Sequence, residues 1–188
     1  ACRQGLALAR EFRNLERQAG YQAGLALAAA GRGQRREALQ QLEAALQQIA
    51  GHTFWHLRTR LLLWLVEQIL PTDPVAADRY LAPALTLART HHRQLLLIQA
   101  ERLQAMRNAV TEPGAAQAHL VALLDRAAGL DLSLEVARTR AALAQIILRH
   151  APDSAAGLAL LDEARRDLER HGAYAALRAL KDAQFVAG

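Results

Sequence analysis

Apolar residues recur at helical spacing in the stretch "GQRREALQQLEAALQQIAG", which covers residues 33–51. Its small and large apolar positions are Ala38, Leu42, Ala45, Leu46 and Ile49. Intervals of three and four residues place these side chains on one face of an α-helix, and the polar residues between them fall on the opposite face. The stretch therefore predicts an amphipathic helix.

The same pattern returns three more times along the chain, at steps of 39, 39 and 41 residues. The matching positions are Ala77, Leu81, Ala84, Leu85 and Ala88, then Ala116, Leu120, Leu123, Leu124 and Ala127, then Gly157, Leu161, Ala164, Arg165 and Leu168. The first position of every set is Ala or Gly. Small residues at matched positions let two helices approach closely, while leucines one turn away fill the groove between them. A repeat of this length predicts stacked helical units.

Further helices are predicted between these repeats and at both ends of the chain. They cover residues 53–70, 93–110 and 133–150, a pair within residues 1–30, and a last helix over residues 173–185. Residues available as N-caps or for the first turn are Thr53, Asp73, Pro74, Thr111, Pro113 and Asp153. The connections are short, so consecutive helices are expected to be antiparallel neighbours.

These features predict an all-α fold, a right-handed α-solenoid of about ten helices in five antiparallel hairpins. The composition agrees, because Ala and Leu supply most of the apolar content and only 4% of the residues are aromatic. A closed helix bundle is the structural alternative, but it gives no reason for one pattern to recur at a nearly constant interval. We expect a single repeat domain over residues 1–188.

The first repeat resembles the tetratricopeptide repeat (TPR). The paired large and small positions of the first TPR helix, its turn glycine and the small–large–small series of its second helix are matched by Leu25, Ala26, Gly33, Ala38, Leu42 and Ala45. This unit covers about residues 19–52. The later units are longer, lack the turn glycine, and place Leu123 where a small residue is expected.

Units of about 39 residues resemble the long TPR variant of MalT-like bacterial transcriptional regulators and related signalling ATPases. The ending "LALLDEARRDLERHGAYAALRALKDA" also resembles the last unit of such arrays. The resemblance implies a repeat array that senses an effector or a partner protein, with a nucleotide-binding module before the array and a LuxR-type DNA-binding module after it. Because neither module is in this chain, we expect it to be a segment of a larger protein.

Positive charge is concentrated in the first third of the chain. Residues 1–60 hold nine arginines against four acidic residues, whereas residues 61–188 hold fourteen basic and fourteen acidic residues. Arg10, Arg13 and Arg17 are spaced to share one helix face, where they would suit phosphate or an acidic protein. No recognition-helix motif accompanies them, so we expect an acidic protein neighbour and no direct nucleic-acid binding by this segment.

The cysteine count and the short apolar runs of the sequence favour the cytoplasm. Cys2 is the only cysteine, so no intrachain disulfide can form, which suits a reducing compartment. No signal segment opens the chain, and the longest apolar run, residues 61–66, is far shorter than the roughly 20 residues that span a bilayer. We therefore expect a cytoplasmic protein with no membrane contact.

No motif in the sequence indicates an enzyme. The stretch "AAAGRGQRRE" lacks the GK[ST] ending of a phosphate-binding loop, and no GxSxG or HExxH is present. His52, His91, His150 and His171 fall at the ends of predicted helices, where an imidazole can bond free carbonyl groups, so we interpret them as structural. We expect no catalytic, cofactor or metal site.

The first helix of each hairpin usually lines the concave surface of a solenoid. In this chain those helices are expected over residues 53–70, 93–110 and 133–149, and the side chains predicted to form a ligand or partner surface are Trp55, Arg58, Arg60, Arg102, Arg138 and Arg140. Trp64 falls near a large buried repeat position, so Trp55 is the better surface candidate. The alternative is that these arginines only keep the outer face solvated.

Three functions fit a repeat array without catalytic residues. The first hypothesis is a non-catalytic module that binds a protein or peptide partner, or other domains of the same chain, within a signalling or transcription regulator. The second is a sensor that binds a small-molecule effector in the concave groove. The third is a structural element for oligomerisation.

Overall fold

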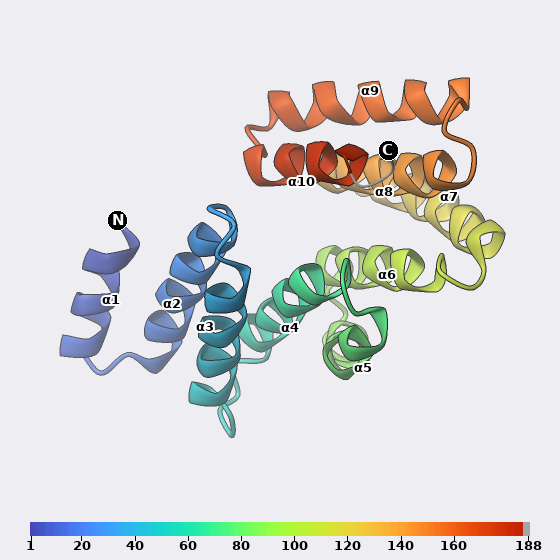
Figure 1. Cartoon of the computed structure of the whole chain (residues 1–188). Helices are drawn as coiled ribbons and strands as arrows, with labels where there is room; N and C mark the ends of the chain where they lie inside the picture. Colours follow the sequence, from blue (N-terminus) through green and yellow to red (C-terminus); the bar gives the residue numbers. More distant parts are fainter. Residues whose placement is uncertain (186–188) are drawn as a thin grey trace. The chain divides into compact units, whose positions relative to one another are not determined.

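The computed structural model describes the backbone of residues 1–185 and the side chains of residues 1–180. Figure 1 shows that this part of the chain is entirely helical, with no strand, which confirms the all-α fold. Its ten helices are α1 (Cys2–Glu11), α2 (Leu15–Ala30), α3 (Arg35–Gln48), α4 (Trp55–Ile69), α5 (Pro74–Thr90), α6 (Gln94–Asn108), α7 (Pro113–Gly129), α8 (Ser133–His150), α9 (Ala155–Arg170) and α10 (Tyr174–Phe185).

The chain divides into two compact units, Ala1–Ala100 and Glu101–Gly188, and the boundary falls inside α6. We call them unit 1 and unit 2. The expectation of one repeat domain over the whole chain stays a prediction, and each unit is described by itself below.

Within each unit, helices that follow one another in the sequence pack together, as in an α-solenoid. In unit 1 the most extensive contacts join α2 to α3 and α4 to α5, and in unit 2 they join α8 to α9. Helices two apart also meet, α2 with α4 and α8 with α10. This arrangement forms hairpins in two layers, with α2 and α4 in one layer of unit 1 and α3 and α5 in the other.

The repeated positions are the core of the stack. The small residues that open the four sets, Ala38, Ala77, Ala116 and Gly157, are all buried, as are the leucines four residues after them, Leu42, Leu81, Leu120 and Leu161. The contact at Gly157 is close, because an added Cβ would lie 2.9 Å from side-chain atoms of both Ile147 and Leu148 on α8. The sequence pattern therefore marks the helix contacts correctly.

A shared helix ending is the second repeated feature. After α1, α2, α5, α7 and α9 the chain turns through a residue with positive φ, and the next backbone N–H bonds the carbonyl five residues earlier. The positive-φ residues are Arg13, Gly33, His92, Asp131 and Gly172, and the bonds run from Asn14 to Ala9, Gln34 to Ala29, Arg93 to Ala88, Leu132 to Ala127 and Ala173 to Leu168. Two of these five turns use glycine, and the other three carry no glycine that would reveal the motif in the sequence.

The predicted helix starts were partly wrong. Asp73 caps α5, where its side chain accepts a hydrogen bond from Ala76 N at 2.8 Å, and Pro74 takes the first turn as expected. The other three caps lie one residue later than Thr53, Thr111 and Asp153. They are Phe54, Glu112 and Ser154, and only Ser154 among them makes a side-chain cap bond.

Candidate functional site

Trp55 lies at the centre of an aromatic and cationic cluster in unit 1. It is the first residue of α4, and its indole stacks on the imidazole of His91, the C-cap of α5, with 4.1 Å between ring centroids and 13° between ring planes. His92 then turns the chain through a φ of 51°, which directs Arg93 back over the same indole at 5.2 Å. The three side chains come from the α4 start and the α5–α6 turn.

A second tryptophan–arginine pair continues this cluster along α4. The guanidinium of Arg60 lies 4.7 Å from the centroid of the Trp64 ring. Trp64 is half-buried, as Trp55 is, so the two tryptophans do not differ in exposure class. His56, Arg60 and Trp64 are spaced by four residues and therefore share one face of α4. We call this set the Trp–Arg strip; its members are Trp55, His56, Arg60, Trp64, His91 and Arg93.

The electrostatic environment of the strip is positive. The pKa of His56 is lowered from its usual 6.5, first by partial burial, which disfavours the imidazolium, and then by the charges of Arg60 and Arg93. Glu16, at the start of α2, acts in the opposite direction. The two arginines therefore outweigh the one acidic residue that influences this histidine.

Arg58 does not join the strip. It is exposed on α4, two residues from both His56 and Arg60, and a two-residue step on a helix points to a different face. Of the six residues predicted from the sequence, the structure thus brings Trp55 and Arg60 into one cluster and leaves Arg58 beside it.

In unit 2, two predicted arginines hold a buried acid. Glu135 of α8 is 2% exposed; its carboxylate lies 3.8 Å from Arg102 Nη2 and 3.1 Å from Arg138 Nη1. Arg102 is itself only 7% exposed, so little of it is accessible to a partner. This arrangement ties α6 to α8 within unit 2.

The third predicted arginine of unit 2, Arg140, bridges α8 and α9. Its Nε lies 3.3 Å from Glu163 Oε2, and its Nη1 pairs with Asp167. Asp167 also pairs with Arg170, and Arg126 on α7 pairs with Glu101 on α6. The arginines of unit 2 that were predicted to face a ligand are thus engaged by acids of their own unit.

The two units differ sharply in how their charges are balanced. Residues 1–100 hold twelve arginines and seven acidic residues, whereas residues 101–188 hold eleven basic and eleven acidic residues, so the net charge of +5 belongs to unit 1. The ion pairs described above all join residues of unit 2, and none of them includes an arginine of unit 1. Unit 1 therefore presents its positive charge to the surroundings.

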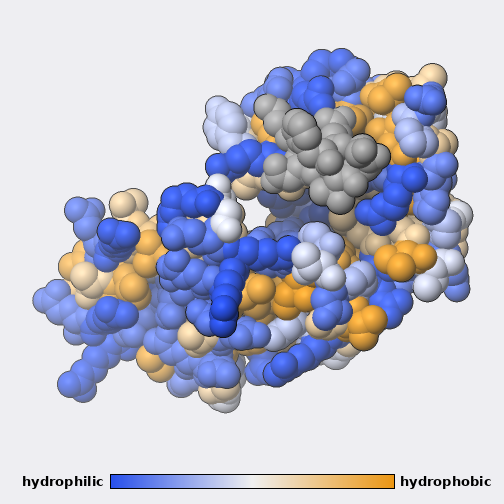
Figure 2. All heavy atoms as spheres, viewed as in Figure 1, coloured by the Kyte–Doolittle hydropathy of each residue, from blue (hydrophilic) through white to orange (hydrophobic). Residues whose placement is uncertain are grey.

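A groove between α1 and α2 is the second surface feature of unit 1. It encloses about 190 Å³ and is lined by Leu8 and Phe12 from α1 and by Arg17 and Tyr21 from α2. Leu8 and Phe12 are exposed, and Figure 2 shows apolar surface over α1 among hydrophilic side chains.

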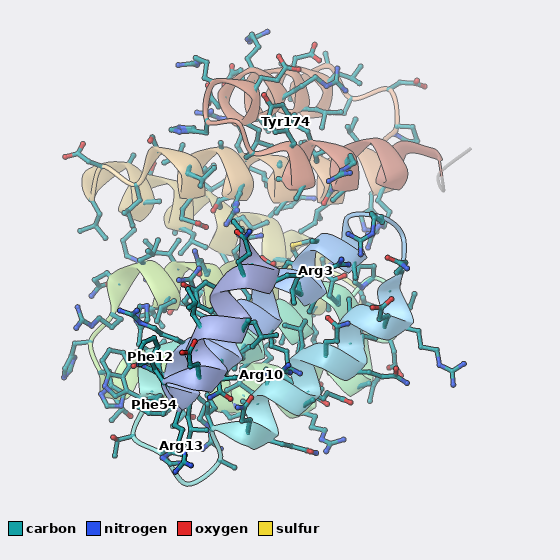
Figure 3. All side chains as sticks on the ribbon, turned by 90° about the vertical axis from the view of Figure 1, so that its left-hand side faces the viewer. Arg3, Arg10, Phe12, Arg13, Phe54 and Tyr174 are labelled. Carbon is teal, nitrogen blue, oxygen red and sulfur yellow. The ribbon has the colours of Figure 1, made fainter. Side chains whose placement is uncertain are left out.

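The basic residues near this groove are arranged differently from the prediction. Figure 3 shows Phe12 on one side of α1 and Arg3 and Arg10 on the other. Arg13 lies in the turn after α1, with a φ of 50°, and Arg17 belongs to α2. Arg10, Arg13 and Arg17 therefore do not share one helix face, and that prediction was wrong.

The described residues show neither a metal-binding cluster nor a membrane-spanning helix. Within the described residues no group of three or more His, Cys, Asp or Glu side chains lies close enough together to hold a metal ion. No described helix combines the length and the apolar character needed to cross a membrane. Comparison with models of known protein families and with curated proteins found no match.

Sequence reasoning missed four of the six members of the strip, namely His56, Trp64, His91 and Arg93. His91 was interpreted only through its place at a helix end, where the structure indeed puts it as the C-cap of α5, and Arg93 was not singled out. A weak signal was present, because both flank a residue with positive φ in a turn that follows a repeat helix. Stacking of that turn on Trp55 depends on hairpin packing, which the sequence pattern does not specify.

Proposed function

We propose that the chain is a non-catalytic TPR-like module that binds a protein partner, with unit 1 as the docking region. The observation that carries this proposal is the contrast in charge balance. Helices α2 and α4 form one layer of unit 1, and α4 carries aromatic and arginine side chains at its surface without acidic partners. Exposed tryptophan and arginine are the residues that most often dominate the binding energy of protein interfaces.

The wider setting that we propose is a MalT-like, LuxR-type bacterial regulator. The repeat of about 39 residues and the hairpins in two layers support a long-unit TPR array, and stacked repeats of this kind are commonly used as interaction surfaces. The sequence of the complete gene product tests the setting: an upstream nucleotide-binding module and a downstream helix-turn-helix are expected, and their absence would exclude this form of the proposal.

The binding function is tested by reconstitution with a purified partner. Proteins retained by the immobilised chain from the source cells would be identified, expressed and titrated one by one against the purified chain. We expect at least one binary complex whose affinity falls with added salt, because exposed charges contribute. Failure of every purified candidate to bind would contradict the proposal.

A small-molecule effector is the second candidate, and the α1–α2 groove is the observation that favours it. At about 190 Å³ the groove is smaller than the roughly 300–1,000 Å³ of typical ligand pockets, which is why we rank a protein partner first. A metabolite that raises the melting temperature of the chain by several degrees, with the rise lost in Tyr21→Ala, would reverse this order.

A further inference from the structure

We propose that the Trp–Arg strip is the docking site for an acidic peptide segment, whose carboxylates are bound by Arg60 and Arg93. This inference rests on the proposed protein-binding function and specifies the chemistry of the partner. It is carried by three features of the strip: the contacts of its arginines with tryptophan, the excess of positive charge that acts on His56, and the tryptophan faces that are already in contact with other side chains.

Both arginines contact a tryptophan and keep hydrogen-bond donors available. The Cζ atom of Arg60 lies over the Trp64 ring, 4.7 Å from its centroid, and that of Arg93 lies over the Trp55 ring at 5.2 Å, so each guanidinium makes a cation–π contact. The five N–H donors of a guanidinium point outward in its own plane, where they match the two oxygens of a carboxylate. Neither side chain forms a hydrogen bond or ion pair among the described residues.

Stacking also lowers the cost of binding at this site. A free arginine side chain loses rotamer freedom when it is fixed in a complex, at a cost of about 0.5–1.5 kcal/mol for each immobilised side chain. An arginine already held against a tryptophan has lost part of that freedom before the partner arrives. Two such arginines on one surface therefore form a preorganised pair of carboxylate sites.

Positive charges outnumber negative ones around His56, at the centre of the strip. Glu16 is the one acidic residue whose charge acts on His56, against the two arginines that act in the opposite direction. With a net charge of +5 over residues 1–100, long-range attraction also favours an acidic partner. An acidic segment thus complements both the local contacts and the wider field.

The occupied tryptophan faces favour a peptide over a nucleic acid. Sequence-tolerant binding of single strands relies on open aromatic faces on which bases stack. In the strip, His91 and Arg93 lie against Trp55, and Arg60 lies over Trp64, so both indoles already have stacking partners. The groups that the strip offers to a partner are the N–H donors of two guanidinium groups, and these suit carboxylates.

Tryptophan fluorescence provides a direct test, because Trp55 and Trp64 are the only tryptophans in the chain. The full chain would be titrated with a blocked peptide of ten glutamates, and a peptide of ten glutamines would serve as the uncharged comparison. We expect a saturable change in emission with the glutamate peptide. The double variant Arg60→Gln, Arg93→Gln should weaken binding by about tenfold or more, since two charge-assisted contacts are lost.

The matched control is Arg36→Gln paired with Arg32→Gln, which removes the same charge from unit 1 outside the strip; Arg32 is exposed in the turn between α2 and α3. Arg36 is exposed on α3, and its neighbour Arg35 bonds the carbonyl groups at the C-terminal end of α4, so Arg36 lies at the opposite end of α4 from Trp55. We expect this control to change the affinity by less than about threefold through the general field alone. Circular dichroism would verify that both double variants fold like the parent chain.

Three results would overturn the inference. They are equal losses in the strip variant and the control, equal binding of the glutamine peptide, and tighter binding of a ten-residue oligothymidylate than of the glutamate peptide; the last would indicate a nucleic-acid surface. A purified partner that binds the parent chain and the strip variant equally well would overturn the site while leaving the proposed function intact.

Discussion

Replacing Gly157 by alanine tests the tight contact between α8 and α9. Gly157 fills the small-residue position of the fourth repeat, and an alanine Cβ there would lie 2.9 Å from Ile147 Cγ2 and from Leu148 Cδ2, closer than real Cβ contacts allow. Overpacking of this kind costs about 1–3 kcal/mol. Alanine recovers about 0.5–1 kcal/mol of helix propensity, so the expected net loss is about 1 kcal/mol.

Gly20→Ala is the matched control, because an alanine Cβ at Gly20 of α2 would have nothing within 4 Å. Only the gain in helix propensity applies there, so this variant should be more stable by about 0.5–1 kcal/mol. The two substitutions are chemically identical and are predicted to have opposite signs.

Equilibrium urea unfolding of the full-length chain, followed by far-UV circular dichroism, measures both effects. The midpoint should fall for Gly157→Ala and rise for Gly20→Ala, with unchanged slopes. If Gly157→Ala were as stable as the parent chain or more stable, the small-residue position would not set the helix contact, and the physical account of the repeat would be refuted.

Three further predictions follow from single contacts. Tyr80→Phe removes the 2.6 Å hydrogen bond from the Tyr80 hydroxyl to Glu43 that joins α5 to α3, and should cost about 1–2 kcal/mol in urea unfolding; no change would mean that water replaces the bond. Glu135→Ala removes the buried carboxylate that pairs with Arg102 and Arg138 and should cost about 3 kcal/mol, and the loss should be smaller when Arg102 is already replaced by Met. Because the pKa of His56 is lowered in the folded chain, the unfolded chain binds the proton more readily, and the free energy of unfolding should fall as the pH drops through 6.5 and below. His56→Gln should flatten this decline in a pH series of urea titrations, and an unchanged decline would assign it to other groups.

The sequence predicted the helices well because one physical requirement repeats. Each stacking contact needs a small residue and a leucine one turn away, so Ala38, Ala77, Ala116 and Gly157 could be recognised by their spacing, and all four are buried. Helix ends were harder to predict. The positive-φ turns accept arginine, histidine and aspartate as well as glycine, since the 6→1 backbone bond stabilises the turn without requiring one side chain.

The candidate site was predictable only in part, because charge pairing is a property of the folded chain. Arg60 and Arg140 look alike in the sequence, since each ends the tripeptide "RTR". In the structure Arg140 meets the acids of α9, whereas Arg60 lies on Trp64 without an acidic partner among the described residues. Which arginines find an acid depends on the neighbouring helix, and a spacing within one helix does not contain that information.

The most direct test of the account maps the bound glutamate peptide on the isotopically labelled full chain by NMR. The account predicts that the indole N–H signals of Trp55 and Trp64 and the Nε–H signals of Arg60 and Arg93 shift most. It also predicts that signals from residues 101–180 stay nearly unchanged. Shifts spread evenly over all exposed arginines, or centred on residues 101–180, would contradict it.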